Sequence, residues 1–483
     1  MALMRSKLGY GAAVVVGALC LSTLGVTGAV GSQKAVLTGD SPVRFRPGSP
    51  GVGDAYFPLE GNGGYDVQHY GLALTYLPSR HHLGGTATIF ATATQNLSRF
   101  DLDLKNYKVG SVTVNGGAAR FARQGQELVV TPRQGLLKGN RFIVVVAYAG
   151  TPHTVVHSPI VFGAPYGWIY TKDGAFVGCA PNAASTWYPS NDHPSDKATF
   201  RFDITVPTGT KVVSNGELIR QISDGSRDTF TWSERAPMAT YLATVDIGRY
   251  DFHSTRTDAG IPEFVGVDPA LEQRVEATKV IGLTGDITDY WAKLFGPYPF
   301  SSTGAIIDNV PKIGFSLETQ TRPLYGFVPD PGTASHELAH QWFGDSVSVE
   351  RWRDIWLNEG FAVFANWLWT EHTTGRSTYA TARHFFKLFF RGDRFWKQSI
   401  ADPGRDTMFS FAVYYRGGMT FASLRHRIGD RKFFTLMKTW ATQHRYGNVT
   451  TRQFTDLAEK VSGRNLDGFF RTWLWDQTKP PKI

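Results

Sequence analysis

The hydrophobic period changes once along this chain of 483 residues, and that change limits the folds it can adopt. From about residue 65 to residue 252, short segments alternate apolar with polar residues and are rich in Val, Thr, Phe and Ile. Examples are ATIFATAT, RFIVVVAYAG, ATFRFDITVP and FTWSE, with Gly, Asn and Pro between such segments. This alternation is typical of half-buried antiparallel strands. We therefore expect an N-terminal antiparallel β domain.

From about residue 270, apolar residues recur every three to four positions, which is the period of amphipathic helices. Expected helices include ALEQRVEATKVIGLTGDITDYWAKLFG, TASHELAHQWFG, DIWLNEGFAVFANWLWTEH and GMTFASLRHRIG, whereas TGAIIDNV and IGFSLETQ are expected strands. With 42% hydrophobic and 13% aromatic residues, the chain can form two or three packed domains. The predicted fold class is α+β and multidomain, with a β domain over residues 54–252 and a mainly helical domain over residues 253–483.

The first 31 residues differ from the rest of the chain. Arg5 and Lys7 precede an apolar stretch over residues 8–30, and small residues suited to signal peptidase follow, a pattern typical of an export signal. The stretch is also long enough to span a bilayer, so an uncleaved N-terminal anchor is the alternative. Residues 32–53 are rich in Pro, Gly and Ser and are predicted to be a flexible linker. We expect a secreted or cell-envelope protein, attached to a membrane only if the first segment stays uncleaved.

Cysteine content and charge exclude some classes of protein. Cys179 is the only cysteine after the first segment, so no intramolecular disulfide is expected there. The net charge of +9 comes from 50 Lys and Arg against 41 Asp and Glu, spread without long runs. Because no basic stripe is interleaved with aromatic residues, nucleic-acid binding is not expected. A basic surface of this kind would be attracted at most to an anionic cell envelope. We also expect the protein to be a monomer.

The stretch ASHELAHQWFGD has the spacing of a metal site. On a helix, His336 and His340 lie on one face and can direct ring nitrogens at one ion. Glu337 then points to a neighbouring side, where it can reach a metal-bound water without binding the metal. Thr333 or Ser335 can cap this helix. The pentapeptide alone is not specific in a chain with 13 histidines, so a third ligand is required.

The segment WRDIWLNEGFAVFANWLW supplies a third ligand in Glu359, with eighteen residues between it and His340. Two antiparallel helices joined by DSVSVERWR would bring this carboxylate back over the histidines. Three protein ligands would then leave the fourth position for water, as in catalytic metal sites. A carboxylate in such aromatic sequence would otherwise be costly to bury, which favours a ligand over a solvated side chain.

HELAHQWFGD followed by WLNEGFA resembles the gluzincin aminopeptidases, the zinc metallopeptidase family that includes aminopeptidase N. The resemblance continues through WYPSNDHPSDKATFRF, VSNGEL, MATYLATVDIG and VYYRGG and covers nearly all of the chain after the N-terminal segment. It implies a thermolysin-like catalytic domain with one Zn²⁺ per chain, held by His336, His340 and Glu359. It also implies that Glu337 is the general base, which takes a proton from zinc-bound water and passes it to the leaving amine.

Two further roles are implied by the resemblance. Tyr414 in VYYRGG matches the family's Tyr-x-Lys/Arg-Gly pattern, in which the hydroxyl stabilises the oxyanion, with the neighbouring Tyr415 as the alternative. Glu318 in GFSLETQT matches the glutamate of the family's Gly-x-Met-Glu-Asn motif, which binds the free α-amine of the substrate. The implied activity is hydrolysis of N-terminal residues from peptides with a free N-terminus.

The chain departs from the family pattern around the amine site. Phe315 stands where the motif opens with glycine, and Thr319 stands where it closes with asparagine. Near GCAPNAAS, where many relatives supply a second acidic group, this chain has Cys179, Ala180 and Asn182. We therefore expect the amine site to depend on Glu318 alone.

Two other functions compete with an aminopeptidase. One is a catalytically silent binding protein of the same fold, against which the intact set of motif residues argues. The other is an endopeptidase or an epoxide-hydrolase-like variant of the same zinc site, which Phe315 and the missing second acid allow.

Because the sequence stops at WDQTKPPKI, we expect no long C-terminal helical domain and a more open active site than in larger relatives.

Overall fold

The computed structural model describes residues 43–483, and residues 44–483 form one compact unit. The predicted export signal or anchor and half of the predicted linker, residues 32–42, lie outside the described residues. Within residues 43–483, the helices are all too short or too polar to cross a membrane. The described end of the linker is not a free connection, because β1 (Arg46–Pro47) pairs with β4 (Leu97–Asp103). Its backbone hydrogen bonds hold it against the β domain.

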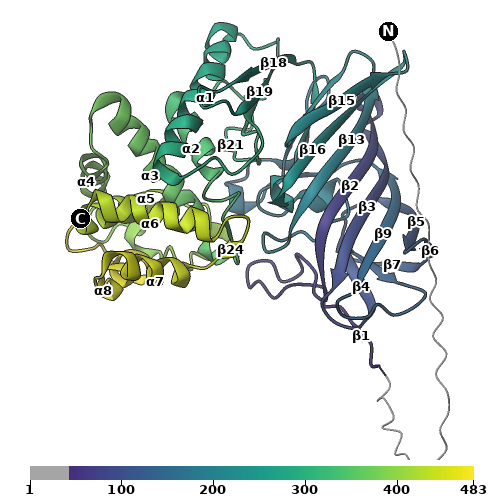
Figure 1. Ribbon diagram of the computed structural model, residues 1–483, viewed down its shortest axis with the longest axis horizontal. Helices are drawn as coiled ribbons and strands as arrows, with labels where there is room; N and C mark the ends of the chain where they lie inside the picture. Colours follow the sequence, from purple (N-terminus) through teal and green to yellow (C-terminus); the bar gives the residue numbers. More distant parts are fainter. Residues whose placement is uncertain (1–42) are drawn as a thin grey trace, which may run out of the picture. The chain divides into compact units, whose positions relative to one another are not determined.

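A large, mainly antiparallel sheet dominates the first half of the described chain (Figure 1). Its order is β15 (Glu217–Ser223), β16 (Arg227–Ala239), β13 (Lys197–Pro207), β2 (Tyr65–Leu77), β3 (His82–Ala93), β9 (Arg141–Gly150), β5 (Lys108–Val114) and β6 (Gly117–Ala118). The pair β13 and β2 is the parallel one in this sheet. Buried side chains alternate with partly buried or exposed ones along most of β2 and along β13, as the period of two in the sequence predicts.

Two smaller sheets complete the β half. One has the order β1, β4, β8 (Glu127–Thr131) and β7 (Arg120–Gln124). The other has the order β10 (Thr154–Val155), β11 (Tyr166–Tyr170), β12 (Ala175–Gly178), β17 (Val245–Gly248) and β14 (Lys211–Ser214). The second of these matters for function, because the segments that follow β12 and β14 contact the candidate active site.

The second half begins with a five-stranded sheet and continues as helices. The sheet has the order β18 (Asp251–Arg256), β19 (Pro262–Val267), β20 (Thr303–Ile307), β22 (Leu324–Tyr325) and β21 (Ser316–Leu317). Strand β18 runs across the boundary predicted between residues 252 and 253, and that boundary stays a prediction. The segment IGFSLETQ, expected to be a strand throughout, is extended only over β21.

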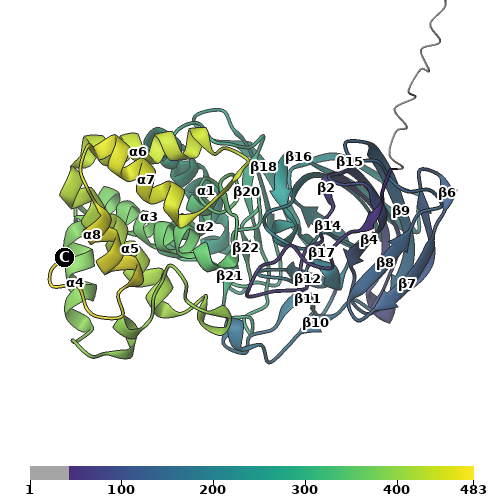
Figure 2. The same cartoon turned by 90° about the horizontal axis from the view of Figure 1, so that it is seen from below.

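Eight α-helices follow or interrupt this sheet in the described chain: α1 (Arg274–Phe295), α2 (Pro331–His340), α3 (Trp356–Thr374), α4 (Thr378–Leu388), α5 (Phe411–Ile428), α6 (Asp430–Gln443), α7 (Thr451–Ser462) and α8 (Asp467–Phe470). Figure 2 shows the five-stranded sheet between these helices and the N-terminal sheets. A short pair, β23 (Ser348–Val349) and β24 (Asn448–Val449), joins the loop after α2 to the start of α7. The predicted α+β class, with a β domain followed by a mainly helical domain, is confirmed.

Helices α3 and α5 cross at very short range, next to Glu359 on α3. The backbones meet at Gly360 and Gly417, where an added Cβ on either residue would lie 2.6 Å from the Cα of the other. The adjacent residue on α5, Arg416, is fully buried and donates to the carbonyls of Trp473 and Gln398 at 2.7 and 2.8 Å. Arg416 therefore ties the end of the chain to α5.

Candidate active site

Helix α2 presents the two histidines of the motif. It starts at Pro331, and the Asp330 carboxylate caps it by accepting from the N–H groups of Gly332 and Thr333 at 2.7 and 3.1 Å. The cap predicted at Thr333 or Ser335 is therefore wrong by about one turn, because Pro331 suits the first helical position and leaves the capping position to Asp330. The helix ends at His340, so the two histidines lie on its last turns.

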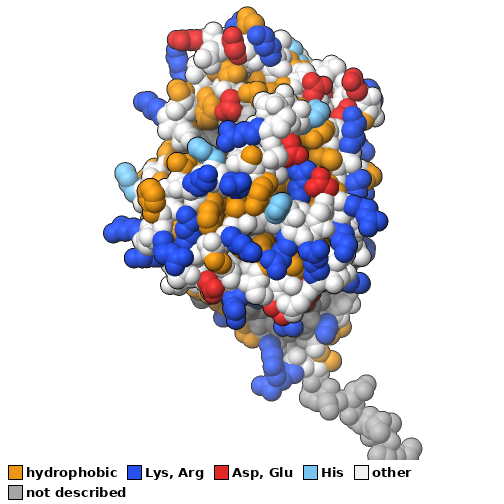
Figure 3. Space-filling model, turned by 90° about the vertical axis from the view of Figure 1, so that its left-hand side faces the viewer, with side chains coloured by type: hydrophobic (Ala, Val, Ile, Leu, Met, Phe, Trp, Pro, Cys, Tyr) orange, Lys and Arg blue, Asp and Glu red, His pale blue; other side chains and the backbone are white. Residues whose placement is uncertain are grey.

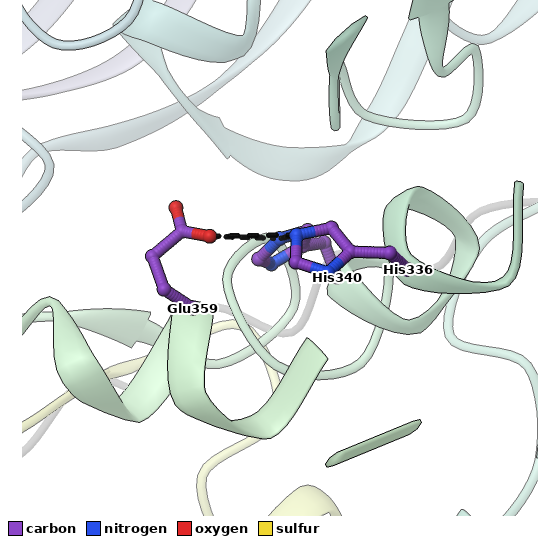
Figure 4. A group of neighbouring side chains, drawn as sticks. All are labelled: His336, His340 and Glu359. Carbon is purple, nitrogen blue, oxygen red and sulfur yellow. Dashed lines mark hydrogen bonds and ion pairs between the residues drawn. The ribbon is translucent and has the colours of Figure 1, made fainter. Parts of the chain in front are cut away.

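Three side chains converge at the end of α2 (Figure 4). The Nε2 atoms of His336 and His340 are 3.2 Å apart, and the Glu359 Oε2 lies 3.5 Å from the first and 3.6 Å from the second. Glu359 comes from the first turn of α3, so the loop between the helices does return this carboxylate to the histidines. All three side chains are largely buried, with 14% exposure for His336 and 5% or less for the other two.

A backbone contact orients the His340 ring. Its Nδ1 lies 3.1 Å from the carbonyl oxygen of Phe343, and since a carbonyl only accepts, Nδ1 carries the hydrogen and Nε2 is left free as a ligand atom. Gly344 makes room for this arrangement. Its φ is 141°, and a Cβ at this position would lie 3.0 Å from His340 Nδ1.

The buried ionisable side chains around His336, His340 and Glu359 include more carboxylates than groups that carry positive charge. Burial raises the pKa of Glu318 and Glu337, and it lowers the pKa of His336. Burial would also lower the pKa of His340, but the facing Glu359 carboxylate raises it to about 10. Three buried carboxylates thus gather around one imidazole that can hold a proton. A divalent cation would supply the missing positive charge.

Glu337 and Glu318 face the same space from two sides. Glu337 follows His336 on α2, but it does not belong to the group of neighbouring ligand atoms formed by His336, His340 and Glu359. It forms a second group with Glu318 and His340, whose ligand atoms lie within 4.8 Å of one another. Glu318 follows β21 and is 6% exposed. The structure therefore brings together the histidines and all three glutamates that the sequence singled out.

Contacts from the β domain hold the segment that carries Glu318. Asn215, after β14, donates to the carbonyl of Gln320 at 2.7 Å, and the Gly216 N–H donates to Thr321 Oγ1 at 2.7 Å. From the other side, Gln341 at the end of α2 donates to the Glu318 carbonyl at 3.1 Å. This explains the motif VSNGEL in the β domain, which positions Glu318 against α2.

Tyr414 and Tyr415 occupy different surroundings on α5. The Tyr414 ring lies parallel to the His336 ring, with centroids 6.0 Å apart, and burial, with the charge of Glu359 adding to it, raises the pKa of the Tyr414 hydroxyl. The Tyr415 ring packs against Phe411 and Phe385, with centroids 3.9 and 4.6 Å away. Only Tyr414 is thus stacked beside the metal-ligand group, as the family pattern implies for the oxyanion tyrosine.

The residues that depart from the family pattern have distinct positions. Phe315 and Ala180 line the cavity beside Glu318, whereas Thr319 is buried and its hydroxyl donates to the Arg322 carbonyl. Asn182 does not reach the cavity wall. Its amide donates to Glu60 Oε1 at 2.9 Å and its carbonyl accepts from Tyr166 at 3.0 Å.

The cavity in front of the metal-ligand group has a volume of about 500 Å³. Its ionisable groups come from His336, Glu337, His340, Glu359 and Glu318, and its hydroxyl groups include those of Ser316, Tyr414 and Tyr415. The rest of its wall includes Val161, Phe162, Ala180, Phe315, Leu317, Phe409 and Phe411. Sequence patterns did not single out Phe162, Phe409 or Phe411. Phe162 follows η2 (Pro159–Val161) of the β domain, which packs against η7 (Arg405–Thr407), so segments far apart in sequence form this apolar wall.

The donor set fits zinc. Zinc prefers His nitrogen and carboxylate oxygen at about 2.0–2.2 Å in tetrahedral geometry, which places ligand atoms roughly 3.3–3.5 Å apart. The measured separations of 3.2, 3.5 and 3.6 Å agree with this requirement. The three protein ligands leave one position toward the cavity, as catalytic rather than structural zinc sites do. A fold with a β domain, a helical domain and this site defines the class of zinc metallopeptidases.

The chain belongs to the peptidase M1 family. The profile of the Peptidase M1 N-terminal domain matches residues 66–242, and that of the Peptidase family M1 domain matches residues 332–473. The crystal structure of the M1 zinc metallopeptidase from Deinococcus radiodurans superposes with a TM-score of 0.82 at 28% identity, covering 89% of this chain and 98% of that one.

Curated relatives include proteins named aminopeptidases from a bacterium and an archaeon. Aminopeptidase N of Streptomyces lividans is 26% identical over 405 residues, which is 77% of this chain and 46% of the relative. Leucyl aminopeptidase of Saccharolobus solfataricus is 25% identical over 409 residues, covering 78% of this chain and 49% of the relative. The chain thus spans about half the length of these relatives.

Proposed function

We propose that this protein is a zinc aminopeptidase, which removes single residues from the free N-terminus of peptides. The observation that carries the proposal is the position of Glu318. This carboxylate faces the same cavity as His336, His340 and Glu359, where it can bind a charged α-amine beside the metal. Relatives named aminopeptidases and a Deinococcus variant bound to a Tyr-Ser-Ala substrate support the proposal.

The roles of the side chains follow from their positions. A zinc ion held by His336, His340 and Glu359 would supply Lewis acidity, which polarises the scissile carbonyl and makes water nucleophilic at neutral pH. Glu337 takes the proton of the attacking water and delivers it to the leaving amine. Tyr414 donates a hydrogen bond to the carbonyl oxygen as that oxygen gains negative charge.

The apolar wall of the cavity sets the class of the first residue. A cavity of about 500 Å³ with Phe315, Phe409, Phe411 and Phe162 on its wall accepts a large apolar or aromatic side chain. An acidic side chain would meet the carboxylate of Glu318 and apolar rings instead of a cation. We therefore expect N-terminal Leu, Phe, Trp and Tyr to be cleaved faster than Asp or Glu.

The test compares free and N-acetylated peptides of the same sequence, with products identified by mass spectrometry. Free peptides should lose single N-terminal residues, and acetylated peptides should resist, because acetylation removes the charge that Glu318 binds. A charge-assisted hydrogen bond contributes about 1.5–3 kcal/mol, so Glu318→Gln should lower kcat/KM for free peptides by roughly ten- to a hundred-fold. Internal cleavage of acetylated peptides at the rate of free ones would instead support an endopeptidase on the same site.

Export is a separate part of the proposal and depends on residues 1–31. Support comes from the order of basic, apolar and small residues in this segment. Expression of the full chain in a bacterial host, followed by fractionation and mass measurement, tests it. A mature protein lacking these residues outside the cytoplasm supports secretion, a full-length protein in the membrane fraction supports an anchor, and a full-length cytoplasmic protein contradicts both.

A further inference from the structure

The charge of this protein is concentrated at one end of the chain. Residues 376–483 contain 20 Lys and Arg against 8 Asp and Glu, a net charge of +12. The preceding 375 residues contain 30 against 33, a net charge of −3. Figure 3, which faces the end of the molecule that carries α4 and α8, shows many blue side chains on this face and few red ones, with orange side chains between them. The excess positive charge therefore lies on the helical end of the molecule and is not spread evenly over its surface.

Within this end, one segment combines cations with exposed apolar side chains. We name residues 383–397 the cationic tip, with sequence RHFFKLFFRGDRFWK. Phe390 is 75% exposed and Leu388 is 52% exposed. Its five cations, all of them exposed, are Arg383, Lys387, Arg391, Arg394 and Lys397. An aromatic ring left this exposed between cations has no role in the core, and exposed apolar side chains that gather in one short segment indicate a contact surface.

Contacts within the segment and with Lys479 fix the conformation of the cationic tip. The Phe389 ring stacks on the Phe395 ring with centroids 3.8 Å apart, and the Asp393 N–H donates to the Phe390 carbonyl at 3.1 Å to close the turn. Lys479 donates to the carbonyl of Phe389 at 2.8 Å. Asp393 is the one acidic residue of the segment, and its carboxylate caps η6 (Arg394–Lys397). The apolar tip is thus presented on a packed base, at little entropic cost to a partner.

We propose that the cationic tip docks this protein on an anionic lipid bilayer, with Leu388 and Phe390 entering the interface and the surrounding cations contacting headgroups. Aromatic and Leu side chains beside Lys and Arg are the composition of interfacial membrane-binding segments. Each cation near an anionic surface strengthens binding about five-fold. A soluble polyanion would use the cations but would leave the Leu388 side chain in water, so the pairing favours a lipid surface.

Docking at the cationic tip would bring the cavity entrance toward the membrane. Phe411 lines the cavity and is 51% exposed, and its ring lies 5.9 Å from Phe389 and 6.3 Å from Phe395, measured between centroids. The base of the cationic tip and the rim of the cavity are therefore continuous. Peptides close to the bilayer surface would then be presented to the site at raised local concentration.

The experiment measures co-sedimentation with vesicles of phosphatidylcholine alone and of phosphatidylcholine with phosphatidylglycerol at about seven to three. All variants are made both in the full chain and in a chain that begins at residue 32. In the full chain, residues 1–31 are the same in every variant and contribute equally to vesicle binding. We expect at least ten-fold stronger binding to the anionic vesicles. The pair Leu388→Ser with Phe390→Ser should weaken binding about ten-fold or more. The pair Arg391→Gln with Arg394→Gln should weaken it roughly 25-fold, about five-fold for each cation.

Matched controls lie on the β domain. Ile219 and Ile222 on β15 are 46% and 49% exposed, and Arg220 and Arg227 are exposed beside them. Ile219→Ser with Ile222→Ser, and Arg220→Gln with Arg227→Gln, should leave vesicle binding unchanged. All variants should unfold at the temperature of the parent protein within a few degrees, because the substituted side chains are exposed.

Several outcomes would overturn the proposal. Equal binding to neutral and anionic vesicles, or equal losses in the cationic-tip and control variants, would show that the segment does not direct docking. Loss of binding in the arginine pair alone, together with equally strong capture by heparin, would assign the cations to soluble polyanions. If light scattering detected dimers of the parent protein and the Leu388→Ser with Phe390→Ser variant were monomeric, the apolar pair would be a contact with a second copy of the chain.

Discussion

The crossing of α3 and α5 offers a sharp test of how the active site is positioned. Substituting Gly360→Ala places a Cβ 2.6 Å from the Gly417 Cα and 2.9 Å from the Gly417 carbonyl carbon. Carbon atoms in contact prefer about 3.5–4.0 Å, and both contacted atoms belong to a helix backbone that cannot rotate away. The helices must therefore separate by roughly 1 Å at this point. Glu359 precedes the substituted residue on α3, so the carboxylate moves relative to the histidines on α2.

The magnitude follows from two opposing effects. Overpacking costs about 1–3 kcal/mol, and replacing a helical glycine by alanine recovers roughly 0.5–1 kcal/mol, so the free energy of unfolding should fall by up to about 2.5 kcal/mol. A displacement of about 1 Å at catalytic groups can cost roughly a hundred-fold in rate, and we expect a loss of that order in kcat/KM with weaker zinc retention. The measurements are denaturant unfolding, aminopeptidase kinetics and metal content after dialysis.

A second helical glycine serves as the control. Gly282 lies in α1, and a Cβ added there would have no heavy atom within 4 Å outside its own stretch of helix. Gly282→Ala should therefore stabilise the protein by up to about 1 kcal/mol and leave activity unchanged. If Gly360→Ala matched Gly282→Ala in both stability and turnover, the close helix crossing would not be what positions Glu359.

Other perturbations probe the remaining groups. Burial would raise the pKa of Asp54, but hydrogen bonds from His193 and two backbone N–H groups lower it to about 2 from 3.8. This lowered pKa stabilises the folded protein above about pH 4 by roughly 2 kcal/mol, and the contribution is lost as pH falls toward 2. Asp54→Asn should therefore destabilise the protein at pH 7 but not at pH 2, and a pH-independent loss would contradict this. Tyr414→Phe should lower kcat by roughly 10²–10³-fold with little change in metal content, whereas equal losses in Tyr415→Phe would exclude a specific oxyanion role. Glu337→Gln should keep zinc and lose turnover, whereas Glu359→Gln should lose zinc, and equal metal loss in both would show that the roles are misassigned. A chelator should abolish activity without unfolding the β domain, and full activity in metal-free protein would refute the zinc site.

Much of the fold and part of the site follow from local sequence. Periods of two and 3.6 separate the β half from the helical half because side-chain direction repeats with the backbone geometry. The spacing of His336 and His340 places both rings on one helix face for the same reason. The start of α2 is harder to predict, because Pro331 and Asp330 compete with Thr333 and Ser335 for the same end of the helix.

Only the tertiary structure decided which distant groups share the cavity. Glu359 reaches the histidines because two glycines let α3 and α5 touch, and Glu318 faces α2 because Asn215 of the β domain holds the segment after it. Phe162 joins the apolar wall across the two halves of the chain, without a sequence pattern to indicate it. Such contacts depend on the packing of whole elements, which a residue's neighbours in sequence do not determine.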